Sequence, residues 1–355
     1  MKKRTFQRAL LALTGATMLA GAALAQTAAP AAGPMVELSQ YSGADRLERL
    51  IAGAKKEGKL SIYTSAPTDD IGALIAAFEK KYGIKVSVWR SGSENVLQRT
   101  VTEARGNRFT VDVVETNGPE LESIAREKLF QPIASPHHAN LMTEAVMPHK
   151  AWVSTRLNVF VQAYNTKLVK KEELPKTWQD LALPHWKGRL GVEAEDQDWL
   201  AGVAGLLGEE RGIKTFREVV ANNGVSVRKG HTLLTQMVVS GEVPFALTVY
   251  NYKAEQLKQK GAPIDWIAIG SAVPRPNGVG VLRSAPNPHA AMLFYEFEIS
   301  EEGQKLLSDR GSMPTNPKVD TPFSKLPIKI VDVRVMLDEY DKWNKLFDDI
   351  FAIKR

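Results

Sequence analysis

Three strand–turn–helix units follow one another between residues 59 and 129. Their apolar, β-branched strands cover residues 59–65, 84–89 and 111–114, and each strand precedes a turn and a segment with apolar positions at helical spacing. Connections of this kind place successive strands parallel to one another, with right-handed crossovers. The series therefore predicts an α/β fold with a mostly parallel, doubly wound sheet.

Hydroxyl and amide side chains gather where these strands end. The carboxyl ends of parallel strands meet at one edge of a sheet, and the following helices begin there with unpaired N–H groups. Such an edge suits a carboxylate, phosphate or phosphonate, whereas capping of the helices is the alternative role for the same side chains. The candidate ligand-binding residues of this region are Thr64, Ser65, Ser91, Ser93, Thr116 and Asn117.

A second corner between a strand and a helix carries two tyrosines. An apolar run over residues 242–250 ends at Tyr250, and Asn251 and Tyr252 begin the polar, helix-forming segment that follows. A phenol at such a corner can donate, accept, stack or bind a hard metal, although tyrosines of strands are more often packing residues. Tyr250 and Tyr252 are therefore candidates for contact with a ligand.

An acidic corner precedes a tryptophan at residues 193–199. Its carboxylates could bind a cation, whereas carboxylates at the start of a helix also complement the helix dipole. We include Asp196 and Trp199 among the candidate ligand-binding residues, the indole as a cover for the apolar part of a small organic acid.

The N-terminus has the pattern of a secretion signal. A basic segment precedes an apolar run over residues 9–24, and the small residues at 23 and 25 predict cleavage after Ala25. Residues 26–36 are predicted to form a disordered leader. We expect a periplasmic or secreted protein that does not insert into a membrane after cleavage.

The charge, cysteine content and length of the chain exclude several kinds of protein and of binding site. Removing the four basic residues of the signal leaves a formal charge of 6 − 4 = +2, and the remaining basic residues alternate with acidic ones, which argues against binding to nucleic acid. The absence of cysteine excludes disulfides and thiolate metal sites. A chain of 355 residues is long for one core, so two lobes are expected.

Catalytic and nucleotide-binding motifs are absent from the sequence. Residues 53–60 match a phosphate-binding loop only in part, because Leu60 stands where the motif needs a hydroxyl residue. We predict that the protein is not an enzyme and has no cofactor. A periplasmic hydrolase, assembled from scattered Asp and His residues, is the alternative.

Several segments, each weak alone, occur in an order that is specific. They are residues 60–65 (LSIYTS), 78–86 (FEKKYGIKV), 111–114 (VDVV), 188–191 (GRLG), 240–243 (SGEV), 278–283 (GVGVLR) and 300–304 (SEEGQ). With them the chain resembles the periplasmic solute-binding proteins of ABC importers. More narrowly it is similar to the ferric-ion-binding group, of type 2 and of extracellular solute-binding family 1.

The resemblance implies two lobes joined by hinge strands, each lobe a mostly parallel sheet flanked by helices. It assigns residues 37–157 and 279–330 to the first lobe, and residues 158–278 and 331–355 to the second, with the last helix packing back. A solute is held as the lobes close, and the closed protein delivers it to an inner-membrane permease. The protein is expected to be a monomer.

The resemblance also bears on the solute. Iron proteins of this group place a histidine after the first strand, where this chain has residues 64–67 (TSAP), and a glutamate after the third, aligned with Asn117. They use two adjacent tyrosines where this chain has Asn251 and Tyr252, with Tyr250 one place earlier. We therefore expect a small anionic organic solute. Ferric iron, held with a synergistic anion through Tyr250 and Tyr252 as metal ligands, is the alternative.

Overall fold

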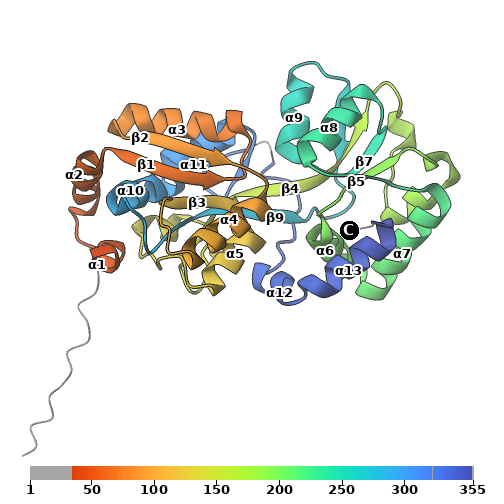
Figure 1. Cartoon of the computed structure of the whole chain (residues 1–355). Helices are drawn as coiled ribbons and strands as arrows, with labels where there is room; N and C mark the ends of the chain where they lie inside the picture. The colour runs from red at the N-terminus through yellow and green to blue at the C-terminus, as the bar shows by residue number, and fades with distance from the viewer. Residues whose placement is uncertain (1–33, 322, 354–355) are drawn as a thin grey trace, which may run out of the picture.

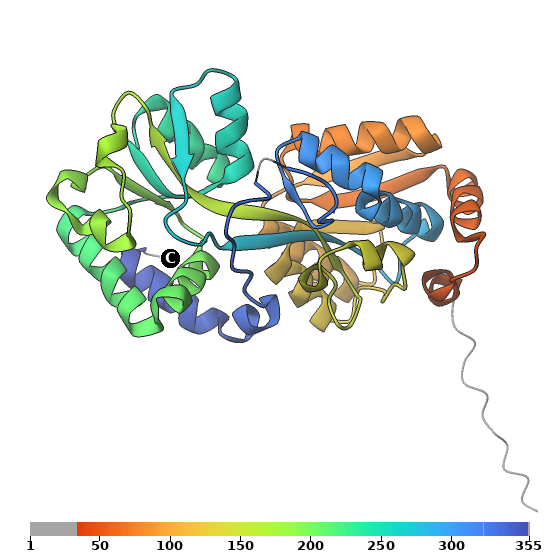
Figure 2. The ribbon, with the colours of Figure 1, turned by 180° about the vertical axis from the view of Figure 1, so that it is seen from behind.

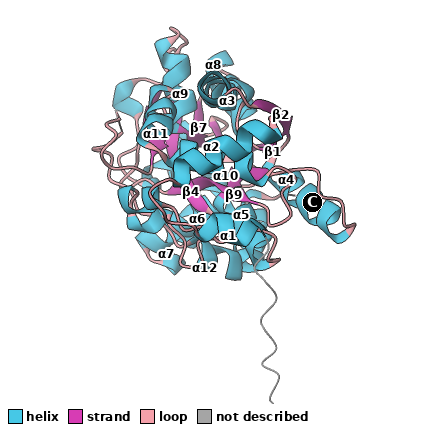
Figure 3. Ribbon diagram, turned by 90° about the vertical axis from the view of Figure 1, so that its left-hand side faces the viewer, coloured by secondary structure: helices cyan, strands magenta, loops and turns pink. Residues whose placement is uncertain are grey.

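The protein consists of two α/β lobes that lie side by side (Figure 1), as a computed structural model shows for residues 34–321 and 323–353. The expected two-lobed fold is therefore confirmed. Helices surround the strands when the molecule is viewed along its length (Figure 3). The predicted signal peptide, its cleavage site after Ala25 and most of the leader lie outside the described residues.

The first lobe contains the three units expected from the sequence. Its sheet has the order β2 (Lys85–Arg90), β1 (Lys59–Thr64), β3 (Val113–Asn117), β9 (Pro274–Val281) and β4 (Val153–Asn165). The first three strands are parallel, and β9 is antiparallel to both of its neighbours. The helices of this lobe are α1 (Pro34–Gln40), α2 (Arg46–Glu57), α3 (Thr68–Tyr82), α4 (Ser93–Arg105), α5 (Gly118–Arg126), α10 (Pro288–Ile299) and α11 (Glu301–Asp309).

The second lobe repeats the pattern on a smaller sheet. There β7 (Phe245–Tyr250) is parallel to β5 (Leu190–Glu193), which is parallel to β6 (Ser226–Arg228). Its helices are α6 (Gln197–Leu207), α7 (Glu209–Asn223), α8 (His231–Ser240) and α9 (Asn251–Gln259). Short 3-10 helices occupy Pro136–Asn140, Thr143–Ala145, Lys171–Glu173, Trp178–Ala182 and Pro184–Trp186.

One strand belongs to both lobes. The first part of β4 pairs with β9 and with β10 (Met313–Pro314), and its second part pairs with β7 and β8 (Ile264–Ile267). All residues of β4 and β9 are buried. The proposed lobe boundary at 157/158 falls inside β4, and the boundary at 278/279 falls inside β9. Seen from behind, the two strands lie next to each other at the centre of the molecule (Figure 2).

The end of the predicted leader is ordered. Residues 34–36, expected to be disordered, begin α1, and the Met35 side chain is buried in the core of the first lobe. A single apolar anchor is the physical reason for this difference, because burial of Met35 offsets the entropy lost on ordering the chain.

The C-terminal segment also differs from the prediction of one helix in the second lobe. Two helices form, α12 (Val333–Asp338) and α13 (Tyr340–Phe351), with the break at Glu339. The helix α12 packs on α5 of the first lobe, whereas α13 packs on α6 and α7 of the second. Val335 and Tyr340 are 50% and 38% exposed. The segment therefore bridges the lobes. Within the described ranges, no helix is long and apolar enough to span a membrane.

The close packing of β9 on β4 leads to a prediction about Gly278. A Cβ atom at this position would lie 2.0 Å from the carbonyl oxygen of Val153, which is backbone and cannot move aside. We expect Gly278→Ala to lower the free energy of unfolding by roughly 1–3 kcal/mol or more. Urea denaturation measures this change.

The matched control is Gly72→Ala in α3, where a Cβ meets no atom within 4 Å. Alanine is the better helix former, so this variant should be more stable than the wild type by about 0.5–1 kcal/mol. Equal stability of the two variants would contradict the described packing of β9.

Candidate ligand-binding cleft

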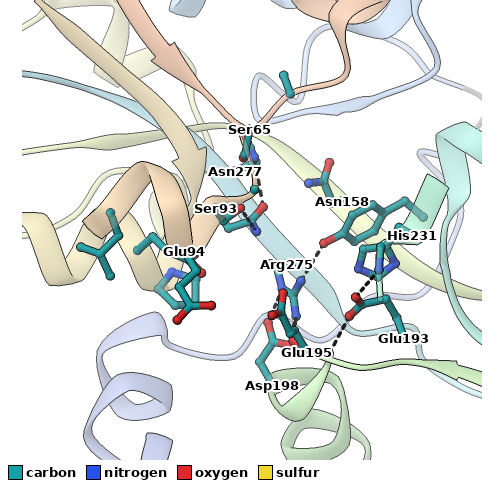
Figure 4. Close-up of a pocket in the computed structure, with 18 of the residues that line it drawn as sticks. Ser65, Ser93, Glu94, Asn158, Glu193, Glu195, Asp198, His231, Arg275 and Asn277 are labelled. Atoms are coloured by element: carbon teal, nitrogen blue, oxygen red, sulfur yellow. Dashed lines mark hydrogen bonds and ion pairs between the residues drawn. The ribbon is translucent and has the colours of Figure 1, made fainter. Parts of the chain in front are cut away.

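A cleft of about 950 Å³ lies between the lobes (Figure 4). Its walls come from the segments that follow β1, β2 and β3 in the first lobe and β5, β6 and β7 in the second. Residues of α12 and α13, among them Met336 and Trp343, contribute to the lining. The carboxyl ends of the strands in both lobes therefore face one shared space, which is the usual place for ligands in α/β proteins.

The floor of the cleft is the ladder between β4 and β9. Arg156 lies opposite Asn277, and Asn158 lies opposite Arg275. Side chains alternate along a strand, so these four share one face of the ladder, and all four line the cleft. Leu157, between two of them, points into an apolar core instead.

The wall of the first lobe is built from hydroxyls and amides. Asn277 Nδ2 donates to Asn117 Oδ1 at 3.1 Å, and Asn117 Nδ2 donates to Ser93 Oγ at 2.7 Å. Because Ser93 accepts this bond, its own hydroxyl hydrogen is available to a ligand. Ser65 lines the same wall. Among the described contacts, no protein acceptor pairs with the backbone N–H groups of residues 93–95, which form the first turn of α4.

Arg90 adds a positive charge to this wall. Arg90, the last residue of β2, is exposed and lines the cleft. Its Nε donates to the carbonyl oxygen of Ala66 at 3.0 Å, and it forms no ion pair with another described residue. The first-lobe wall therefore combines a guanidinium, two hydroxyls and a helix N-terminus, which favour an anion, with one carboxylate, that of Glu94 in the first turn of α4.

The wall of the second lobe carries the two tyrosines. Tyr250 ends β7 and Tyr252 lies in the first turn of α9, and their ring centroids are 6.0 Å apart with an angle of 17° between the planes. Asn251 turns away, since its Oδ1 accepts a bond from the N–H of Val159 at 3.2 Å. Burial raises the pKa of both phenols. Two neutral hydroxyls on nearly parallel rings therefore face the cleft.

Arg275 connects the floor to this second wall. Its Nη1 donates to Tyr250 Oη at 2.8 Å, and its Nε donates to Asp198 Oδ2 at 2.6 Å. Its Nη2 lies 3.1 Å from Asp196 Oδ1. Burial lowers the pKa of Arg275, but the carboxylates raise it by more, so the guanidinium stays charged. Arg275 is neutralised by its own protein and is not a free anion site.

Arg156, the other guanidinium of the floor, is also paired. It lies 2.5 Å from Glu115 and 3.8 Å from Glu298, and all three side chains are buried. Burial, with Glu115 close by, raises the pKa of Glu298 to about 8. Arg156 therefore holds the end of β3 against α10 and offers no unpaired positive charge to a ligand.

Three side chains of the second lobe lie close enough to share a cation. Ligand atoms of Glu193, Asp196 and His231 all lie within 4.8 Å of one another. However, Glu193 accepts backbone N–H bonds from Gly230 and Glu195, both at 2.7 Å, and His231 Nε2 lies 3.1 Å from Asp196 Oδ1. Burial lowers the pKa of His231, while Asp196 and Glu193 raise it by more. When it is protonated, the imidazole of His231 therefore supplies positive charge beside these two carboxylates.

The cleft contains only some of the residues selected from the sequence. Side chains at strand ends reach it where the sheet edge opens, as the pattern of parallel strands requires. Those that line it are Ser65, Ser93, Asn117, Tyr250 and Tyr252.

Three of the selected hydroxyl residues do not line the cleft, because other parts of the protein use them. Thr64 is buried and donates to Glu115. Thr116 is buried behind Ser65, with the two hydroxyl oxygens 2.9 Å apart. Ser91 accepts from the side chain of Asn95 at 3.0 Å.

Two residues of the acidic corner were also misplaced. Asp196 is fully buried beneath the lining, where it pairs with Arg275 and His231. Trp199 is 1% exposed and packs against Trp178 and Phe216, with ring centroids 5.5 and 5.1 Å away. Its place in α6 directs the indole into the core of the second lobe, so it cannot cover a ligand.

Sequence analysis missed the polar residues of the floor. The signal that could have found them is Arg275, a charged residue in residues 274–278 (PRPNG), within the segment that forms the strand β9. The missed lining residues are Arg90, Glu120, Arg156, Asn158, His231, Arg275 and Asn277.

The buried imidazole predicts a pH dependence of stability. The pKa of His231 is raised in the folded protein above the usual value of 6.5, so the folded state binds this proton more tightly than the unfolded chain does. Its stabilisation is present below pH 6.5 and is lost as the pH rises through the folded pKa. We expect His231→Gln to be less stable than the wild type, with a difference that shrinks between pH 6 and pH 9.

Thermal melting across that pH range measures the difference. His185→Gln, at an exposed position, is the control for loss of an imidazole. A difference between His231→Gln and the wild type that does not change with pH would contradict the assigned ion cluster.

Comparison with known proteins agrees with this geometry. The family described as bacterial extracellular solute-binding protein matches residues 110–334. Iron uptake protein A1 of Synechocystis is 27% identical over 270 residues, which cover 71% of this chain and 74% of the relative.

Solved structures share the fold. Iron-bound HitA from Pseudomonas aeruginosa has a TM-score of 0.71 at 25% identity, covering 82% of this chain and 99% of HitA. The periplasmic binding protein AfuA from Actinobacillus pleuropneumoniae, with fructose-6-phosphate bound, has a TM-score of 0.74 at 22% identity, covering 84% of this chain and all of AfuA. The resemblance to the ferric-binding group is thus confirmed, and this chain belongs to the family of bacterial extracellular solute-binding proteins.

Proposed function

We propose that the protein is the periplasmic binding component of an ABC uptake system and captures a small organic solute through an anionic carboxylate, phosphate or phosphonate group. The observation that carries this proposal is the first-lobe wall, where Arg90 and Ser93 line the cleft at the start of α4 and the first N–H groups of that helix have no acceptor among the described contacts. Anions bind at helix N-termini because these donors and the helix dipole both favour negative charge.

Capture follows from the division of the site between two lobes. The anionic group is held by Ser65, Ser93 and Arg90 of the first lobe, and the rest of the solute contacts Tyr250 and Tyr252 of the second. A solute that touches both walls only when the lobes are close together shifts the population toward the closed form. The closed protein, a monomer with no resident cofactor, then delivers the solute to an inner-membrane permease.

The proposal predicts anion binding that depends on Ser93. We expect at least one of three anions to raise the melting temperature of the mature protein relative to chloride at equal ionic strength. The three are inorganic phosphate, methylphosphonate and propionate. Ser93→Ala should weaken that binding roughly tenfold or more, because a hydrogen bond to a charged group is lost. Ser87→Ala, at an exposed position on β2, is the matched control. Absence of stabilisation by every anion would refute the proposal.

Ferric iron is a second candidate, because both tyrosines face the cleft despite the intervening asparagine. If iron is the solute, adding a ferric chelate should produce a visible tyrosinate-to-iron charge-transfer band that Tyr252→Phe removes. Tyr82→Phe, in the core of the first lobe, should leave the band unchanged. For the anionic organic solute that we propose, no such band forms.

A periplasmic hydrolase remains a weaker alternative. The relatives described above are named as uptake and binding proteins. Turnover of a bound solute, abolished by one substitution in the cleft that leaves the fold intact, would be needed to support hydrolysis.

A further inference from the structure

Four residues that line the cleft each have one buried side-chain oxygen without a hydrogen-bond donor among the described residues. They belong to Glu120, Asn158, Gln197 and Asn277. Asn158 and Asn277 are 4% and 2% exposed, and both lie on the floor. A buried acceptor without a donor destabilises the protein, so a group that donates hydrogen bonds is expected to reach this part of the cleft.

Carboxylates from both lobes line the cleft together with this floor. Glu120 lies in the first turn of α5 in the first lobe, and Asp198 lies in the first turn of α6 in the second. Glu195 lines the cleft beside Asp198. Burial raises the pKa of Glu120 to about 7; the charge of Arg275 lowers it, and the charges of Asp198 and Glu195 add to the rise. Above about pH 7, where Glu120 is ionised, both lobes therefore present negative charge to the cleft.

The nearby cations do not balance all of this charge. Arg275 is bound to Asp196, Asp198 and Tyr250, and Lys229 pairs with Glu195 at 2.7 Å. No ion pair is formed by Glu120 with another described residue. Bringing Glu120 toward Asp198 as the lobes close increases the repulsion, unless a positive group lies between them.

We propose that the solute carries an ammonium group in addition to its anionic group, and that the ammonium lies between Glu120 and Asp198, within reach of the unpaired oxygen of Asn158. This inference rests on the proposed function, which supplies the anionic end at Arg90 and Ser93. The ligand class is thus a small zwitterion, an aminated organic phosphate or carboxylate. A body with hydroxyl groups alone would satisfy the acceptors but would leave the facing charges uncompensated.

Matched pairs of ligands test the ammonium directly. O-phosphoethanolamine is compared with ethyl phosphate, and β-alanine with propionate, by calorimetric titration of the mature protein. We expect the aminated member of at least one pair to bind tenfold or more tightly than its partner. Glycerol phosphate serves as the hydroxyl-bearing comparison and should bind no better than ethyl phosphate.

Variants of Glu120 test whether this residue causes the tighter binding of aminated ligands. Glu120→Gln should reduce the ratio of the affinity for O-phosphoethanolamine to the affinity for ethyl phosphate at least tenfold. Glu127→Gln, at the exposed C-terminal end of α5, is the matched control and should behave as the wild type.

A measurement without ligand keeps the inference testable if none of these compounds is the natural solute. Glu120→Lys places an ammonium on the first-lobe wall, opposite Asp198 and Glu195, and should raise the melting temperature relative to the wild type. Glu120→Gln should give a smaller rise, and Glu127→Lys should give none. A fall in melting temperature for both Glu120 variants would overturn the inference.

The outcomes separate this inference from the proposed function. Equal binding of ethyl phosphate and O-phosphoethanolamine overturns the inference and leaves the anionic function standing. Ethylamine binding as tightly as O-phosphoethanolamine supports the cationic position and refutes the anionic function. A ferric charge-transfer band in a protein that binds no pair overturns both.

Discussion

The ladder between β4 and β9 is the constraint on which the rest of this molecule depends. β4 is shared by the sheets of both lobes, and every residue of the two strands is buried. The same ladder carries Arg156, Asn158, Arg275 and Asn277 on the face that lines the cleft. The connection between the lobes and the floor of the binding site are therefore one element, so a change in the angle between the lobes moves the groups that contact the solute.

Burying two guanidinium groups in this ladder determines the charge of the cleft. A buried charge is tolerated only with partners, and Arg156 and Arg275 have theirs on neighbouring elements of each lobe. Carboxylates of the protein itself neutralise their positive charge. The charges left for a ligand differ in sign: the exposed Arg90 lies on the first wall, whereas Glu120 lines the same cleft as the acidic corner of the second lobe. A cleft with charges of both signs suits a solute with one anionic and one cationic end.

The parts of the site that sequence analysis predicted are those that depend on local pattern. Ser65 and Asn117 stand at strand ends, and the carboxyl ends of parallel strands meet at one edge whatever surrounds them. The prediction for Trp199 was wrong because α6 is apolar on nearly all sides, so its sequence does not distinguish the face toward the core from the face toward the cleft. Asn251 suggested a broken tyrosine pair, yet the turn from β7 into α9 directs Tyr250 and Tyr252 to the same side.

The sequence by itself determined the two-lobed α/β fold, the sheet edge that lines the cleft and some of the hydroxyl and phenol groups there, because periodicity and strand order are local properties of the chain. Only the tertiary structure decided which charges remain free. Arg275 meets Asp196 and Asp198 because β9 crosses to the second lobe beside the start of α6, and Glu120 and Asp198 line one cleft although they belong to different lobes. Ion pairing depends on distances between segments far apart in the chain, and no local pattern encodes those distances.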